Sequence, residues 1–196
     1  MAIAAVRPAA DSDVDEIVRI QTGTWEAAYA DLVPEAAIAQ LGSPDTRRAW
    51  ADAVAAGEGF HVLVATEGAQ AVGFCAAARA QAPAVVAPAS DASAAEHTDP
   101  PAVGPEHWAE IGALLVEPRW GRRGHGGRLL AAAAQALRDA GALYGLAWVP
   151  EADEASRRFY TRAGWEPDGT VRVLDTGAGE LREVRITGSL DLKLRD

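Results

Sequence analysis

Glycines and arginines gather in one short stretch between Val116 and Leu130, which reads V-E-P-R-W-G-R-R-G-H-G-G-R-L-L. An apolar segment precedes it and an amphipathic segment follows, so the pattern predicts a strand, a loop and a helix. The first N–H groups of a helix are unpaired and carry a partial positive charge. Glycines let phosphate oxygens approach such groups closely. These residue types therefore predict a phosphate-binding loop with backbone contacts at Gly124, Gly126 and Gly127.

Two familiar phosphate-binding loops do not fit this stretch. The chain has no G-x-x-x-x-G-K-[ST] sequence, which excludes a P-loop. It also lacks G-x-G-x-x-G after the first expected strand and an acidic ribose clamp, which disfavours a dinucleotide-binding fold. Arg122, Arg123 and Arg128 add positive charge to a chain whose net charge is −10. Taken alone, the stretch fits a tight strand–helix turn with solvated arginines equally well.

The elements around this loop indicate a mixed α/β chain. Strands are expected at 2–7, 60–66, 71–79, 108–116, 143–149, 165–174 and 181–194, and helices at 14–29, 34–41, 44–56, 125–140 and 153–163. This order suits one α/β domain over residues 1–196. Residues 80–107 are rich in Ala and Pro, contain no Lys or Arg and show no periodicity. We predict a flexible insertion there, with a functional lid as the alternative.

Composition narrows the function classes. Hydrophobic residues make up 49% of the chain and charged residues 23%, as in soluble globular proteins. The net charge of −10 disfavours nucleic-acid binding, which needs a basic face. The chain has no signal-peptide layout and no run near the roughly 20 apolar residues that a membrane helix needs, so a cytoplasmic protein without a membrane partner is expected. The four scattered histidines predict no metal site.

A second motif decides how the loop is interpreted. The segment D-E-A-S-R-R-F-Y-T-R-A-G-W runs from Asp153 to Trp165. Together with the loop, it resembles the GCN5-related N-acetyltransferase (GNAT) superfamily, whose motifs are V-x-P-x-x-[RQ]-G-x-G-x-G-x-x-L and N-x-x-A-x-x-F-Y-x-x-x-G-[FW]. R-P-A-x-x-x-D near the N-terminus and W-x-x-A-Y at 25–29 are typical of one bacterial branch. The resemblance implies a six- to seven-stranded, mostly antiparallel sheet, splayed between its fourth and fifth strands, with helices on both faces.

The resemblance also implies acetyl-CoA as co-substrate, with its pyrophosphate on residues 122–127. The residues implied to bind it are Leu114, Leu115, Val116, Arg122, Arg123, Gly124, His125, Gly126, Gly127 and Asp153. Backbone groups of 114–116 would bind the thioester carbonyl where the strand bulges. The chain departs from the family pattern at three positions. Gly121 stands where Arg or Gln is usual, Arg122 where Gly is usual, and Asp153 where Asn is usual, so the phosphate contacts should depend on Arg123 and the backbone of 124–127.

The implied reaction is direct attack of an amine on the acetyl thioester. An alkylammonium has a pKa of about 10 and cannot attack until it loses a proton, so a general base helps. Glu110 on the fourth expected strand is the candidate base, as in histone-type members; many other members carry a glutamate on the fifth strand, where this chain has Trp148. Tyr160 is the candidate acid for the departing thiolate.

Other interpretations of these residues stay open. Glu110 equally suits a polar position on a half-exposed strand, and a water chain could replace it as the base. Tyr160 could be a core aromatic, as Phe159 is expected to be. His97 and His107 could shuttle protons, although solvated histidines are more common in such a segment.

Trp25 and Tyr29 lie four residues apart, on one face of a predicted helix. They fit an acceptor site and core packing equally well. The expected acceptor is a primary amine, either on a small molecule or at a protein N-terminus, and the acidic charge favours a small cationic amine. The rival functions are an acyltransferase using a longer acyl-CoA and an acyl-CoA-binding or sensing domain without catalysis. Pairing of two chains as a homodimer through the C-terminal strands stays open.

Overall fold

The computed structural model describes residues 4–57, 59–80, 104–177 and 179–192. Its strands are β1 (Ala4–Pro8), β2 (Phe60–Glu67), β3 (Gln70–Arg79), β4 (Trp108–Val116), β5 (Tyr144–Pro150), β6 (Glu166–Asp175) and β7 (Glu180–Ser189). Its α-helices are α1 (Val14–Tyr29), α2 (Glu35–Leu41), α3 (Pro44–Ala55), α4 (His125–Asp139) and α5 (Glu154–Arg162). Three 3₁₀ turns complete the fold: η1 (Asp11–Asp13), η2 (Pro105–His107) and η3 (Pro118–Trp120).

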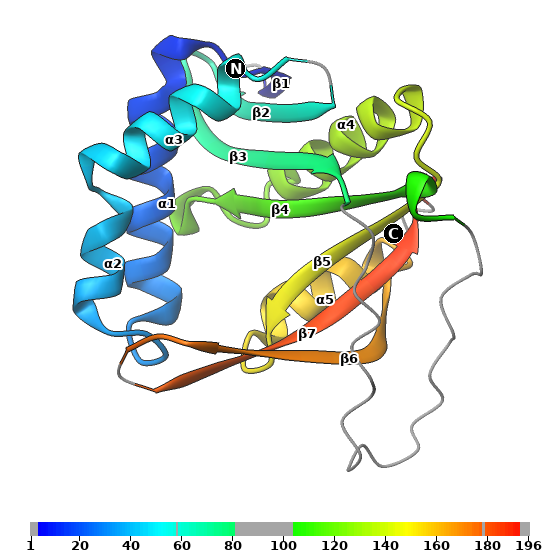
Figure 1. Ribbon diagram of the computed structural model, residues 1–196. Coiled ribbons are helices and arrows are strands. Elements are labelled where there is room, and N and C mark those ends of the chain that lie inside the picture. Colours follow the sequence, from blue (N-terminus) through cyan, green and yellow to red (C-terminus); the bar gives the residue numbers. More distant parts are fainter. Residues whose placement is uncertain (1–3, 58, 81–103, 178, 193–196) are drawn as a thin grey trace.

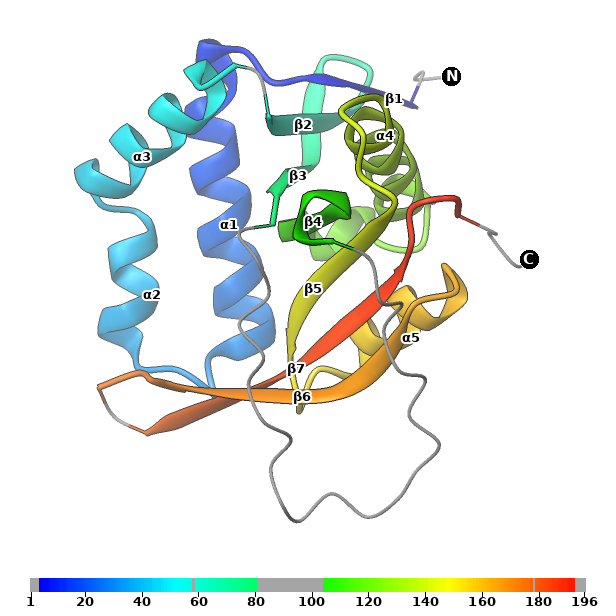
Figure 2. The same ribbon diagram turned by 45° about the vertical axis from the view of Figure 1, so that its right-hand side comes forward.

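The strands form one sheet of seven in the order β1-β2-β3-β4-β5-β7-β6. Helices α1 to α3 lie on one side of the sheet, and α4 and α5 lie on the other (Figures 1 and 2). All pairings are antiparallel except the one between β4 and β5. The predicted fold class, a mixed α/β fold around a mostly antiparallel sheet with helices on both faces, is confirmed.

The sheet divides between β4 and β5. These two strands pair only where residues 108–110 of β4 face residues 144–146 of β5, and Glu110 opposite Leu146 is the last pair. Beyond this pair the strands diverge (Figure 1). The divergence leaves the side of β4 that faces β5 without a neighbouring strand, as the resemblance implied.

The bulge in β4 lies earlier than the sequence indicated. Ala76 of β3 faces Ala113 while Ala77 faces Ile111, so Gly112 is the extra residue. Residues 113–116 then pair with β3 in regular register, and the prediction of a bulge at 114–116 is wrong by two residues or more. A glycine suits this position because an irregular strand conformation costs it little.

Two apolar clusters hold the sheet between its helices. The larger lies on the α4 and α5 side and includes Leu129, Leu130, Leu137 and Trp165, all fully buried. The smaller lies beneath α1 and α3. Because both faces of the central strands are covered, β3 is apolar along most of its length rather than alternating.

The predicted insertion at 80–107 falls largely outside the described residues, which omit 81–103. Both of its ends are described. The backbone N–H of Ala80 donates to the carbonyl oxygen of Trp108 at 3.0 Å, and η2 leads directly into β4. The segment therefore leaves and rejoins the sheet at the adjacent ends of β3 and β4.

Trp165 is fully buried against two glycines that face each other across β5 and β7, Gly145 and Gly188. Its indole Nε1 donates to the carbonyl oxygen of Ser189 at 3.0 Å. A Cβ atom added at Gly188 would overlap the indole ring. The close approach of this ring therefore requires glycine.

We predict that Gly188→Ala lowers the free energy of unfolding by about 1–3 kcal/mol, since the indole must move within a packed core. The control is Gly23→Ala in α1, where an added Cβ meets nothing within 4 Å. It should raise the free energy of unfolding by up to about 1 kcal/mol through helix propensity. Urea unfolding of both variants checks the pair, and equal midpoints would contradict the packing argument.

Candidate active site

The loop between β4 and α4 presents unpaired backbone donors. Gly124 caps α4 with φ of 82°, and the first helical bond runs from the N–H of Arg128 to the carbonyl oxygen of Gly124 at 3.0 Å. The N–H groups of His125, Gly126 and Gly127 therefore have no acceptor within the helix. A Cβ built at Gly127 meets nothing within 4 Å, so the space in front of this turn is open. The arrangement suits a bound anion.

The loop arginines differ in their surroundings. Arg123 lies over the ring of Trp120, with Cζ 4.7 Å from the centroid, and its Nη1 is 3.7 Å from Oε1 of Glu67. Arg128 folds back and donates from Nη1 to the carbonyl oxygen of Arg123 at 3.1 Å. Arg122 is exposed and has φ of 59°, in the left-handed region that favours glycine. This conformation explains why glycine is usual at that position in the family.

His125 lies beneath the loop rather than in front of it. Its side chain is 1% exposed, and its Nε2 is 2.9 Å from Oε2 of Glu67. Neither ring nitrogen reaches hydrogen-bond geometry with a described residue. Any contact of this residue with a phosphate must therefore come from its backbone N–H.

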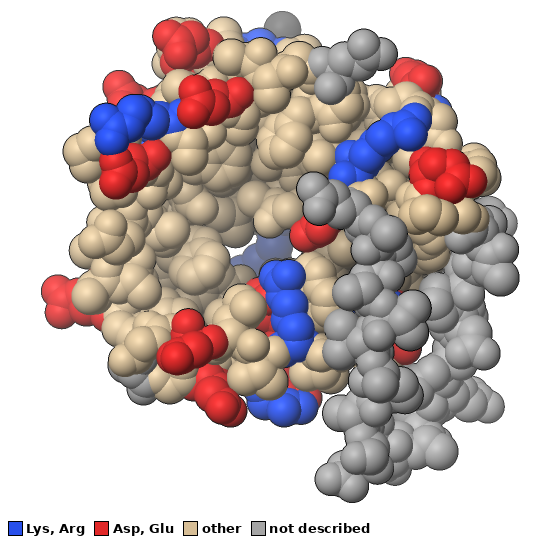
Figure 3. Space-filling view, viewed as in Figure 1, with Lys and Arg blue, Asp and Glu red and all other residues tan. Residues whose placement is uncertain are grey.

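A cavity of about 150 Å³ lies where β4 and β5 diverge. Its lining residues are Gln21, Trp25, Tyr29, Glu110, Ile111, Gly112, Ala113, Leu114, Leu115, Trp148, Val149, Pro150, Ser156, Tyr160, Arg172 and Glu183. The fold thus brings together six of the predicted site residues, from α1, β4 and α5. Figure 3 shows this face of the molecule hollowed at its centre, with acidic and basic side chains along the lower edge of the hollow.

Tyr160 lines this cavity although it is only 6% exposed. Its ring stacks on Trp165 with centroids 5.4 Å apart, and Phe159 packs edge-on at 5.2 Å. Burial raises the pKa of the Tyr160 hydroxyl far above its ordinary value. The phenol therefore keeps its proton at neutral pH, as an acid must before it acts.

Glu110 occupies the point where the sheet divides. It is the last residue of β4 that pairs with β5, and it lines the cavity. Within the described ranges its carboxylate forms no ion pair and no side-chain hydrogen bond. The carboxylate is therefore available to a molecule bound in the cavity.

Tyr29 and Asp153 connect the two sides of the cavity. The Tyr29 hydroxyl donates to Oδ2 of Asp153 at 2.6 Å, and burial together with this bond raises the pKa of Tyr29. Asp153 caps α5 by accepting the Ser156 N–H at 2.9 Å and the Ser156 hydroxyl at 2.7 Å. All three partners donate, which suits a carboxylate better than an amide. The predicted contact of Asp153 with the cofactor stays a prediction.

Ten of the cavity residues were absent from the predicted site, and Trp148, Arg172 and Glu183 are among them. Nε of Arg172 donates to Oε2 of Glu183 at 2.6 Å, and its Cζ lies 4.4 Å from the ring centroid of Trp148. The sequence D-T-G-A-G-E at residues 175–180, which links the last two strands, contains the signal for this pair. Once Asp175 faces Glu180 across the turn, antiparallel register places Arg172 opposite Glu183.

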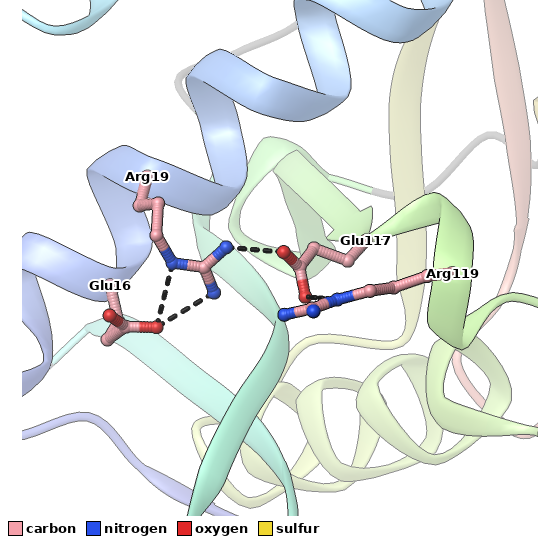
Figure 4. A network of polar contacts seen from close by, with 4 residues as sticks. All are labelled: Glu16, Arg19, Glu117 and Arg119. Carbon is pink, nitrogen blue, oxygen red and sulfur yellow. Dashed lines mark hydrogen bonds and ion pairs between the residues drawn. The ribbon is translucent and has the colours of Figure 1, made fainter.

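A polar network fixes the segment that enters the phosphate-binding loop (Figure 4). Arg19 of α1 donates to Glu16 at 2.8 Å and also to Glu117, which follows β4. Arg119 donates to the same carboxylate at 3.1 Å. Burial alone would raise the pKa of Glu117, but the bonds from Arg19 and Arg119 outweigh burial and hold it below its ordinary value. The network therefore joins α1 to the start of the loop.

The fold and this cavity define an α/β protein with unpaired backbone donors at a helix N-terminus beside a divided sheet, and comparisons identify the family. The model of the Acetyltransferase (GNAT) family matches residues 17–165, and the chain belongs to this family. Members use acetyl-CoA as co-substrate, and the unpaired N–H groups of residues 125–127 are of the kind that bind phosphates. A search among curated proteins found no match.

Solved structures show the same fold at low sequence identity. PaiA N-acetyltransferase from Thermoplasma acidophilum, in complex with coenzyme A, has a TM-score of 0.65 at 15% identity, over 95% of this chain and 99% of that chain. YncA from Salmonella typhimurium, with its cofactor acetyl-CoA, has a TM-score of 0.67 at 19% identity, over 96% of this chain and 94% of that chain. The ribosomal-protein-S18-alanine N-acetyltransferase from Escherichia coli has a TM-score of 0.63 at 15% identity, over 96% of this chain and 94% of that chain.

Two further observations concern the described residues alone. No group of three or more His, Cys, Asp or Glu side chains is arranged to hold a metal ion in the ranges that the structure describes. None of the helices described here is long and apolar enough to cross a membrane.

We predict that Gly127→Asp weakens acetyl-CoA binding without destabilising the fold. The site has room for the side chain, and a carboxylate in the first turn stabilises a helix by about 0.3–1 kcal/mol, yet the same charge repels phosphates. Calorimetric titration with acetyl-CoA should show at least a tenfold loss, about 1.4 kcal/mol. Gly127→Ala is the matched control and should bind within about threefold of the wild type, under 1 kcal/mol. Normal affinity of the aspartate variant would contradict the loop assignment.

Proposed function

We propose that this protein is an N-acetyltransferase that moves the acetyl group of acetyl-CoA to a primary amine by direct attack within a ternary complex. The observation that carries the proposal is the cavity between β4 and β5, which gathers Tyr160 and Glu110 beside the unpaired edge of β4. Family membership supports the acyl transfer itself. The cavity supplies a carboxylate, Glu110, and a phenol, Tyr160, which suit the proton transfers of this reaction.

Acetyl-CoA supplies an acetyl group already activated as a thioester. The protein's backbone N–H groups at 125–127 hold the phosphates, and unpaired backbone groups of β4 near Leu114 and Leu115 orient the acetyl carbonyl. Glu110 removes the proton from the incoming ammonium. The hydroxyl of Tyr160 gives its proton to the departing sulfur. The C–N bond forms and the C–S bond breaks, and the second proton that the nitrogen loses as the amide forms restores the Tyr160 phenol.

Trp25 and Tyr29 form the acceptor side of the cavity in this proposal. Their rings pack edge-on with centroids 5.1 Å apart, and both line the cavity. The hydrogen bond to Asp153 fixes the Tyr29 ring, so this wall is preorganised for binding.

The decisive experiment measures free thiol released from acetyl-CoA in the presence of a panel of primary amines. We expect release that depends on both the enzyme and the amine, with the acetylated amine detected by mass spectrometry. Hexanoyl-CoA in the same assay tests the rival longer acyl group. Calorimetric binding of acetyl-CoA without thiol release from any amine would instead support a sensing domain.

We predict that Tyr160→Phe lowers kcat about a hundredfold or more, the usual contribution of a positioned acid, while acetyl-CoA affinity is unchanged. The phenyl ring keeps the packing on Trp165, so only the proton donor is lost. The control is Tyr144→Phe at the far end of β5, where the ring packs on Trp108 and should not affect turnover. An unchanged kcat in the Tyr160 variant would reject its role as acid.

We predict that the effect of Glu110→Gln depends on the acceptor. Turnover of an alkylamine should fall about a hundredfold, because that amine arrives protonated and needs a base. An aromatic amine or hydrazine arrives unprotonated, so its turnover should fall much less. Glu106→Gln, an exposed change on η2, serves as the control. Equal losses for both kinds of amine would argue against Glu110 as the base.

A further inference from the structure

The acceptor side of the cavity contains a guanidinium that the proposed chemistry does not use. Arg172 extends from β6 into the lining of the cavity, although β6 is the outermost strand. Acetylation of an amine requires a base and an acid, and a guanidinium suits neither role. Arg172 is paired with Glu183 through Nε alone, which leaves its terminal nitrogens to bind a negative group on the acceptor.

The guanidinium is held by two contacts. Nε of Arg172 donates to Glu183, which is only 8% exposed. The guanidinium of Arg172 lies over Trp148, with Cζ 4.4 Å from the ring centroid. Neither terminal nitrogen donates a hydrogen bond to any residue in the described ranges. Two parallel donors on a fixed plane match the two oxygens of a carboxylate.

The remaining charges near Trp148 are already neutralised. Nε of Arg185 donates to Oδ2 of Asp168 at 2.7 Å, and both side chains are nearly buried. Glu183 is paired with Arg172, which leaves Glu110 as the carboxylate in the lining without a partner among the described residues. The cavity lining therefore contains one carboxylate without a partner in the described ranges, Glu110, and one guanidinium whose terminal nitrogens form no hydrogen bond there, Arg172. A zwitterion has the complementary pattern.

We infer that Arg172 determines acceptor specificity by binding a carboxylate of the acceptor, and that the acceptor is a small amino acid or close analogue with a free carboxylate near its amine. This inference rests on the proposed function, because it assigns the acceptor of the same site. A protein N-terminus has no such carboxylate, since its first residue continues into a peptide bond.

The test compares matched acceptors in the thiol-release assay: an amino acid, the amine that remains when its carboxylate is removed, and a peptide with the same N-terminal residue. Phenylalanine with phenethylamine and methionine with its decarboxylated amine are suitable sets. We expect kcat/KM to favour the free amino acid by about tenfold to a hundredfold, the usual effect of a charge-assisted hydrogen-bonded pair. Equal values, or preference for the peptide, would overturn the inference.

Variants of Arg172 attribute this preference to the side chain. Arg172→Gln should raise KM for the amino acid about tenfold or more and leave kinetics with the decarboxylated amine nearly unchanged, which erases the preference. Arg172→Lys keeps the positive charge but lacks the two parallel donors of a guanidinium, so it should retain part of the preference for the amino acid. Arg182→Gln removes a solvent-exposed ion pair of β7 with Glu151 and serves as the control. A preference that survives Arg172→Gln would overturn the assignment.

The outcomes separate this inference from the proposed function. If amines are acetylated equally well with and without a carboxylate, the proposed N-acetyltransferase function stands and the role of Arg172 is rejected. If neither the amino acids, their decarboxylated amines nor the peptides are acetylated, the proposed function and the inference both fail. Circular dichroism and the unfolding midpoint of Arg172→Gln show whether the variant is folded, and Arg172→Lys carries the test if it is not.

Discussion

The early end of pairing between β4 and β5 is the constraint on which the rest of the structure depends. Three residue pairs join these strands, and after Glu110 the two halves of the sheet separate. Hydrogen-bonding groups on the open side of β4 then lack strand partners, and buried groups of this kind are costly unless something binds them. A bound thioester carbonyl and pantetheine amides would supply such partners. The gap thus leaves backbone groups without partners at the position where the proposed reaction places the thioester.

A divided sheet needs connections from outside the sheet, and α1 provides one through a polar contact with α5 and an apolar cluster with Leu181 of β7. Tyr29 of α1 bonds to Asp153 at the start of α5, and Arg19 of α1 bonds to Glu117 at the start of the loop before α4. Helix α1 therefore contacts both the wall that contains Tyr160 and the segment that positions the phosphate-binding turn. The part-buried bond from Tyr29 to Asp153 spans the gap, and it fixes the position of α1 relative to α5 because a charge-assisted hydrogen bond depends strongly on geometry.

The sequence predicted the elements closely, because their periodicities and end signals are local. Most described strands and helices begin and end within about two residues of their expected positions, and Gly124 with its positive φ opens α4 as the glycine pattern indicated. The exception is the last strand, which was expected to continue to residue 194 but ends at Ser189. The site was predicted where it follows a linear motif, as with Tyr160. Contacts between distant elements were not accessible in this way. Nothing near Tyr29 in the sequence indicates that its hydroxyl bonds to Asp153, and the position of the bulge at Gly112 depends on the register with β3.

Trp148 shows how one substitution changes the roles of its neighbours. Many family members carry a glutamate at this strand position, and a carboxylate there would face Arg185 on β7 and lie near Arg172. With an indole in its place, the two guanidinium groups need other acids, and Glu183 and Asp168 supply them at 2.6 and 2.7 Å. Under the proposed mechanism the base then comes from β4, where Glu110 has no ion-pair partner in the described ranges. The same indole lies under the plane of Arg172, so one aromatic side chain both replaces the carboxylate usual at this position and orients the guanidinium proposed to bind the acceptor.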